Sequence, residues 1–366
     1  MGRKPTRWTN LPRGMRARER GNKIHYYLDT GGKPRKEIPL GSDYVAAVHK
    51  WAELTAAKRP VGADYTFVDV AVAYRAKVFP TKAARTRSDN DKELEWLLKF
   101  FGDPPAPLDG IEPLHVRQYM DWRVIEARKL AILNNTERLA AGRDAQPIPD
   151  TLGQVRANRE KALFSHMWNF ARENGYTKAP NPCAGIKGFK ESGRDVVVSD
   201  QMMQSILEHA GLPLQFAIRL ADLTGQRPGD VLRMSESHIS GGVLHVRQGK
   251  TGAKLRIEIE GELKRLLAEI QAFKSQFKVR PLALLVNESG EQLSKHMLRD
   301  RFDDARAAAG IAKPDFQFRD LRATAATAVD EESGTRSAQA LLGHTTEGMT
   351  ANYIRHKVGK KVKPVR

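Results

Sequence analysis

Apolar and polar residues follow two different periods near the start of the chain. Residues 23–28 and 37–40 have the alternation and branched or aromatic content of strands, and the turn Thr30-Gly-Gly-Lys-Pro34 lies between them. Residues 43–58 change to helical spacing. We therefore expect a small sheet with one helix over residues 1–60. The alternative is a disordered basic tail, which the residues at strand spacing disfavour.

Helical spacing dominates the next stretch, residues 65–188. An apolar stripe runs through 89–101, a long helix should follow Pro113, and another should end at the stop signal Asn174-Gly175. Such stripes are usually core positions, so this part predicts a helical domain.

A segment rich in glycine and lysine, Gly185 to Arg194, predicts an interdomain linker. The residues after it, 195–366, mix helical patterns with a β-hairpin. The hairpin pairs 243–246 with 255–259 around the loop 248–254. The expected fold class is thus multidomain and mainly α with α+β parts, in three domains: 1–60, 65–188 and 195–366.

The composition points to a class of partner through its charge, because the 366 residues carry a formal net charge of +18. Such an excess favours a polyanion as partner, with nucleic acid preferred over a merely basic soluble protein. Cys183 is the single cysteine, which excludes an intrachain disulfide and a cysteine metal cluster. No apolar run is long enough for a membrane span, so we expect a soluble, cytoplasmic protein without a membrane partner.

Several polar residues of the last domain are candidates for chemistry, although each alone has an ordinary structural explanation. They are Arg227 and Asp230 in a loop that begins a helix, Lys250 in the hairpin loop, Arg319 and Arg322 at a helix start, His344 at a helix end, and Tyr353. A phosphodiester repels nucleophiles, so its cleavage needs cations on the non-bridging oxygens, a positioned nucleophile and an acid for the leaving group. Arginine, lysine and tyrosine can supply these functions.

In this order the residues resemble the catalytic set of the tyrosine recombinase family, and within it the phage integrases of lambda type. The matching blocks are Thr-Gly-Gln-Arg227-Pro-Gly-Asp230, Lys250-Thr-Gly-Ala-Lys254, Phe-Arg319-Asp-Leu-Arg322, Leu-Leu-Gly-His344 and Asn-Tyr353-Ile-Arg. The step of nine residues from His344 to Tyr353 also matches the family. The resemblance is strong over 220–356 and looser before it, where relatives carry a helical (SAM-like) core-binding domain and an arm-binding domain.

The resemblance implies a role for each residue. Arg227 and Arg322 would hold the scissile phosphate, and Tyr353 would form a 3′-phosphotyrosyl bond. Lys250 would protonate the departing 5′-oxygen, with Lys254 as the alternative. His344 would hydrogen-bond the phosphate, and Asp230 would orient the arginines. No metal, ATP or other cofactor is required, since arginines supply the positive charge.

One position departs from the family, because Arg319 stands where relatives usually have histidine. Arginine stays protonated and cannot be a general base, although it can still stabilise phosphate charge. The alternative is that Arg319 marks a degenerate or inactive copy.

The function implied is integration, and with helper factors excision, of a prophage or genomic island. The implied partners are double-stranded DNA at attachment sites and a homotetramer on that DNA, with a DNA-bending host factor and an excisionase as further candidates in a bacterial nucleoid. A chromosome-dimer resolvase, a topoisomerase-like nicking-closing enzyme and an inactive DNA-binding regulator are the alternatives. The basic tail 354–366, with six Lys or Arg, would dock onto a neighbouring protomer or touch DNA.

Overall fold

The computed structural model describes residues 11–12, 14–21, 23–32, 34–56 and 65–355. The chain divides into two compact units, Met1–Ser192 and Gly193–Arg366, and each is described by itself. The division falls within the predicted linker.

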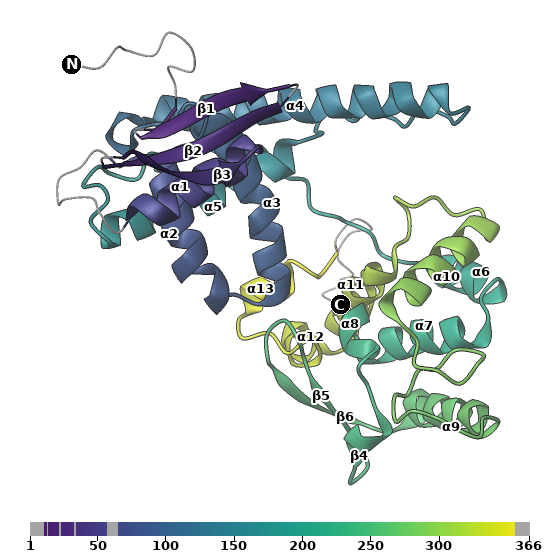
Figure 1. Ribbon diagram of the computed structural model, residues 1–366. Coiled ribbons are helices and arrows are strands. Elements are labelled where there is room, and N and C mark those ends of the chain that lie inside the picture. Colours follow the sequence, from purple (N-terminus) through teal and green to yellow (C-terminus); the bar gives the residue numbers. More distant parts are fainter. Residues whose placement is uncertain (1–10, 13, 22, 33, 57–64, 356–366) are drawn as a thin grey trace. The chain divides into compact units, whose positions relative to one another are not determined.

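The first unit begins with a three-stranded antiparallel sheet (Figure 1). Its strands are β1 (Met15–Arg20), β2 (Lys23–Gly31) and β3 (Lys36–Gly41), in that order. Helix α1 (Tyr44–Ala56) packs against β3 and β2. The two predicted strands and the helix are confirmed, and β1 is an addition. Its sequence begins Met, Arg, Ala, Arg, and the many charged residues hide the apolar alternation by which a strand is recognised. The strand is defined by its pairing with β2.

Helices form the rest of the first unit. They are α2 (Phe67–Lys77), α3 (Ala84–Phe101), α4 (Pro113–Ala140) and α5 (Gln154–Glu173), with the short 3-10 helices η1 (Phe79–Thr81) and η2 (Leu108–Gly110). Thr66 and Asp69 cap α2 reciprocally, which satisfies backbone donors at its first turn. Rings of Phe67, Phe101 and Phe164 bring α2, α3 and α5 together, with centroids 4.9–5.4 Å apart. The sheet, α1 and these helices share one continuous apolar core.

The second unit is mixed. Its elements are α6 (Asp200–Glu208), α7 (Leu212–Thr224), α8 (Pro228–Val231), η3 (Glu236–His238), β4 (Ile239–Ser240), β5 (Val243–Arg247), β6 (Lys254–Glu258), α9 (Gly261–Ser275), α10 (Lys295–Ala308), η4 (Phe318–Asp320), α11 (Leu321–Ser333), α12 (Thr335–Leu342) and α13 (Glu347–Ala351). Strands β4, β5 and β6 form an antiparallel sheet in sequence order. Helix α7 is almost wholly buried, and α9, α10 and α11 pack around it.

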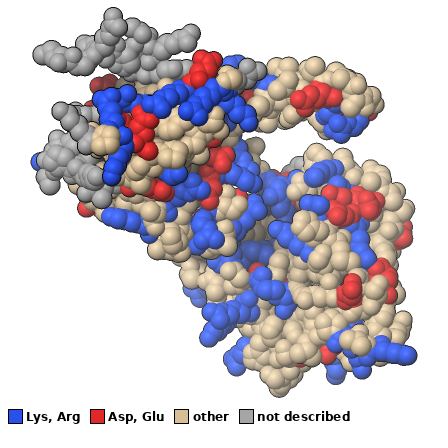
Figure 2. Space-filling model, viewed as in Figure 1, with Lys and Arg blue, Asp and Glu red and all other residues tan. Residues whose placement is uncertain are grey.

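Charge is unevenly distributed on the second unit. On the face seen in Figure 2, Lys and Arg side chains outnumber Asp and Glu on the hairpin side, whereas Asp and Glu side chains gather over α10. The outward residues of β5 and β6 include a cationic cross-strand pair, Arg247 with Lys254. Like charges at such positions repel one another, which is the pattern of a surface that meets an anionic partner.

The expected fold class is confirmed: the chain is mainly helical, with a small N-terminal sheet and a mixed second unit. The division of residues 1–188 into an arm-binding and a core-binding domain stays a prediction. Most of the basic tail 354–366 lies outside the described residues.

Candidate active site

Arg227 is presented by a sharp turn between two helices. Helix α7 ends at Gly225, whose φ of 62° lies in the left-handed region that glycine adopts readily. A Cβ at Gly225 would also come within 3.0 Å of the Leu341 side chain. Arg227 then serves as N-cap of α8, with Pro228 as its first helical residue. The turn and the close contact with α12 set where Arg227 stands.

Arg322 lies in the first turn of α11 and is 2 % exposed. Its guanidinium donates to the carbonyl oxygens of Gly225 and Leu342, each at 2.8 Å. Burial lowers the pKa of Arg322 to about 10, and the charge of Arg227 acts in the same direction. The group therefore remains a cation at neutral pH and is held in one orientation by two backbone carbonyls.

His344 follows the left-handed turn at Gly343 that ends α12. An Arg322 NH2 group lies 3.3 Å from Nε2 of His344, and Nδ1 lies 3.1 Å from the Thr350 hydroxyl. Arginine can only donate, so Nε2 accepts and the proton of the neutral ring is on Nδ1. Burial, with the charges of Arg322 and Arg227, lowers the pKa of His344 to about 4. To donate a hydrogen bond to a phosphate, Nε2 of His344 would have to give up its hydrogen bond from Arg322 and take up a proton.

Tyr353 comes just after α13 and is half-buried. Its ring centroid is 5.1 Å from that of His344 and 5.2 Å from Cζ of Arg322. Burial alone would raise the pKa of the phenol, but the charges of Arg227 and Arg322 and hydrogen bonds from both outweigh it. The pKa of Tyr353 is therefore held below its ordinary value, which favours the nucleophilic phenolate.

Arg227, Arg322 and Tyr353 face one cavity of about 330 Å³, and His344 contacts Arg322 from outside its lining. It is lined by Arg194, Arg227, Pro228, Arg319, Asp320, Arg322, Ala323, Asn352, Tyr353 and Arg355. Four of the predicted residues, two of them 126 positions apart, thus meet at one place. A cavity with this many guanidinium groups around a tyrosine is suited to a phosphate group.

Two glutamines that the sequence did not single out tie the site together. Gln248 accepts from Arg227 at 3.0 Å and donates to Gln226 and to the carbonyl oxygen of Leu342. Gln226 donates to the carbonyl oxygen of Leu341 at 3.0 Å. Both side chains are 1 % exposed. Gln226 lies inside a motif quoted above and Gln248 begins the hairpin loop 248–254, but an uncharged side chain gave no signal of its own.

Arg194 is a second omission, since it belongs to the segment interpreted as linker. Its guanidinium donates to both carboxylate oxygens of Asp320, each at 2.6 Å. Asp320 also accepts from the backbone N–H of Gln317, so it holds the start of α11. No local pattern could have identified Arg194, because its partner is 126 residues away.

The remaining predicted residues do not line this cavity. Asp230 is 4 % exposed, with Oδ2 lying 3.8 Å from the Arg227 guanidinium. Lys250 is exposed in the β5–β6 loop and makes no hydrogen bond or ion pair with any described residue. Lys254 is also exposed, at the start of β6. The catalytic role of each residue is therefore still a prediction.

The described residues include no cluster of three or more His, Cys, Asp or Glu side chains arranged to hold a metal ion. Across the same part of the chain, we find no helix with the length and hydrophobicity needed to traverse a membrane.

Comparison with known proteins points in one direction. Residues 197–359 match the sequence profile of the phage integrase family. The integrase of Escherichia phage HK022 is 34 % identical over 184 residues, which are 48 % of this chain and 51 % of that protein. The aligned stretch thus spans about half the length of that relative.

Solved structures share the fold over a longer stretch. A lambda integrase dimer bound to a COC′ core site has a TM-score of 0.65 at 21 % identity, covering 97 % of this chain and 98 % of that chain. A lambda integrase tetramer bound to a Holliday junction has the same TM-score at 20 % identity and the same coverage.

Proposed function

We propose that the chain is a site-specific tyrosine recombinase that integrates a mobile DNA element, a function supported by the match of residues 197–359 to the phage integrase family. The observation that carries the proposal is the Tyr353 phenol beside Arg227 and Arg322 in one cationic cavity. A purely structural role for Tyr353 would not explain this cavity, because desolvating several guanidinium groups around one ring costs free energy.

In the proposed reaction, Tyr353 gives its phenol proton to water, its oxygen attacks phosphorus, and a 3′-phosphotyrosyl bond forms as the bond to the 5′-oxygen breaks. Arg227 and Arg322 neutralise the non-bridging oxygens while charge develops, and Arg319 adds positive charge at the cavity wall. The departing 5′-oxygen takes its proton from Lys250. Attack by a 5′-hydroxyl of another strand reverses these steps, so religation consumes no ATP.

For Lys250 to act as the acid, its loop must move on DNA binding. The Lys250 side chain is exposed, does not line the cavity and contacts no partner among the described residues. A loop that is tied at its base and free at Lys250 fits a proton donor that engages only when DNA is bound. Apo geometry of this kind is common for catalytic acids.

Duplex DNA is the proposed substrate, and a tetramer on two duplexes is the proposed working assembly. The lambda integrase structures named above are bound to DNA and include a tetramer on a Holliday junction. The net charge of +18 supports the same partner.

Covalent trapping tests the nucleophile. The chain would be incubated with a labelled pool of random-sequence duplexes in the presence of a metal chelator. Each duplex carries a nick, so that the short fragment released by cleavage diffuses away and religation is prevented. We expect a labelled protein–DNA adduct on a denaturing gel, its loss in Tyr353→Phe, and its retention in the matched control Tyr176→Phe. An adduct that persists in Tyr353→Phe would refute the assignment.

A further inference from the structure

The loop that carries Lys250 is bound on both sides of that residue. Before it, Gln248 accepts from Arg227 at 3.0 Å, and after it, the Thr251 hydroxyl donates to the same Gln248 oxygen at 2.8 Å. The N–H of Gly252 donates to the backbone carbonyl of Gln248, also at 2.8 Å. The base of the loop is therefore attached to Arg227, while the Lys250 side chain is left to solvent.

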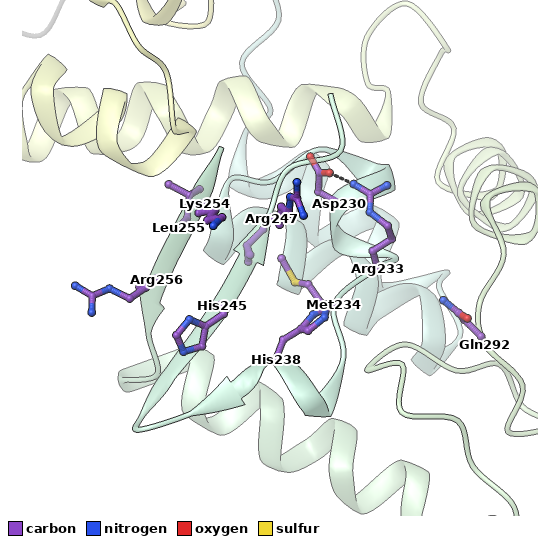
Figure 3. Close-up of a pocket in the computed structure, with 11 residues that line it drawn as sticks. Asp230, Arg233, Met234, His238, His245, Arg247, Lys254, Leu255, Arg256 and Gln292 are labelled. Atoms are coloured by element: carbon purple, nitrogen blue, oxygen red, sulfur yellow. Dashed lines mark hydrogen bonds and ion pairs between the residues drawn. The ribbon is translucent and has the colours of Figure 1, made fainter. Parts of the chain in front are cut away.

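Gly249 adds a second attachment through Asp230 and Arg233. Its N–H donates to Oδ1 of Asp230 at 2.9 Å, and the Arg233 guanidinium donates to the same oxygen (Figure 3). A Cβ at Gly249 would lie 2.9 Å from Cζ of Arg233, closer than side-chain atoms normally approach. Arg233 thus packs against the backbone of the residue that precedes Lys250.

Asp230 connects this attachment to the catalytic cavity. Its Oδ1 accepts from Gly249 and Arg233, whereas its Oδ2 is buried, has no hydrogen-bond partner among the described residues and lies 3.8 Å from Arg227. Arg233 and Asp230 line a different cavity, of about 720 Å³, beside β5 and β6, in which Arg256 extends away from both (Figure 3). Arg233 is therefore separate from the phosphate-facing groups and reaches them through one carboxylate.

We propose that Arg233 is a positioning residue that, through Asp230 and Gly249, sets where the loop 248–253 and its Lys250 stand relative to Arg227. The proposal rests on the proposed function, because it concerns delivery of the leaving-group proton. Without Arg233, the Asp230 carboxylate is free to turn toward Arg227. The carboxylate then competes with Gln248 for the Arg227 guanidinium. The loop then loses both attachments before Lys250.

The test uses a DNA sequence recovered from the trapped adducts, made with oxygen or with sulfur at the bridging 5′ position. A thiol has a pKa of about 8.5, so a thiolate departs without a proton donor. We expect Arg233→Met to slow cleavage of the oxygen substrate on the order of 10- to 100-fold with little change in DNA affinity, since small displacements of a catalytic group cost about this much. The sulfur substrate should restore most of the rate in Arg233→Met and in Lys250→Ala, but none in Tyr353→Phe.

The outcomes separate the two proposals. If sulfur restores Lys250→Ala but leaves Arg233→Met equally slow, the positioning role of Arg233 is overturned while the recombinase mechanism stands. If sulfur restores neither, the proton-donor role of Lys250 fails, and this proposal fails with it. The control is Arg265→Met on α9, which removes the same charge from an exposed pair with Glu262 and should cleave both substrates at the unaltered rate.

A second pair of variants tests the contact itself. Gly249→Ala should also slow the oxygen substrate, because its methyl group meets the Arg233 guanidinium. Since both changes act on one contact, Gly249→Ala combined with Arg233→Ala should be less impaired than the product of the two single effects. Independent, multiplicative effects would count against the proposal, and thermal unfolding of each variant identifies any that fail to fold.

Discussion

The positive charges of Arg227 and Arg322 act on the pKa values of both Tyr353 and His344. Two cations beside a half-buried phenol lower its pKa, and burial, together with the same two charges, keeps the neighbouring imidazole neutral. Neutral His344 can accept a hydrogen bond from Arg322, so the ring holds the arginine without adding a competing positive charge. The arrangement concentrates cationic character on the two guanidinium groups that face the cavity.

The lowered pKa of Tyr353 leads to a pH-dependent prediction. Phenolate increases as pH rises, so adduct formation should increase with pH and reach its plateau below the ordinary tyrosine value of about 10. In Arg227→Gln one of the lowering charges is gone, and the pKa of Tyr353 should rise. Ultraviolet titration, taken as the difference between each protein and its Tyr353→Phe form, measures this pKa directly. Equal titration midpoints with and without Arg227 would contradict the electrostatic argument.

At the level of secondary structure, α4 and α5 are joined by a buried polar cluster as well as by apolar packing. Glu160 of α5 is 1 % exposed and accepts from the Tyr119 hydroxyl at 2.7 Å and from Arg123 at 3.0 Å. Cζ of Arg123 also lies 3.8 Å from the ring centroid of Trp96 in α3. The cluster therefore connects α3, α4 and α5 through polar and cation–π contacts in addition to their apolar packing.

Removing the carboxylate should destabilise the first unit strongly. Glu160→Ala leaves the Arg123 charge buried without its partner, and the free energy of unfolding should fall by about 3–5 kcal/mol. The exposed pair of Arg85 with Asp89 on α3 is the control, and Arg85→Ala should cost less than about 1 kcal/mol. Denaturant unfolding followed by tryptophan fluorescence gives both values. Similar losses in the two variants would mean that burial of Arg123 is not what makes the cluster important.

For the whole molecule, charge excess and the cationic hairpin side predict affinity for DNA that depends steeply on salt. Each phosphate neutralised contributes about −0.9 to the slope of log K against log salt concentration. With on the order of 6–10 phosphate contacts, affinity for a non-cognate duplex should fall roughly 10³- to 10⁵-fold between about 50 and 200 mM salt. Fluorescence anisotropy across a salt series measures the slope, and a slope near zero would show that the charge serves another partner.

The sequence by itself determined which residue types could perform the chemistry and in which local elements they lie. Arg227 follows a helix-ending glycine, the hairpin alternates cleanly, and Tyr353 follows His344 at a short fixed interval. Such features depend on neighbours within a few positions, so periodicity and turn chemistry reveal them. The mainly helical fold class was available from the same local patterns, and the order of the motifs carried the resemblance to the phage integrases.

Only the tertiary structure decided which side chains hold the catalytic candidates in place. Arg322 donates to a carbonyl 97 residues away, Gln248 to one 94 residues away, and Arg194 to a carboxylate 126 residues away. Strand β1 likewise exists through its pairing with β2. These long-range contacts form because segments distant in the sequence come together and satisfy one another's buried polar groups. A local sequence pattern carries no information about which distant segment will be the partner.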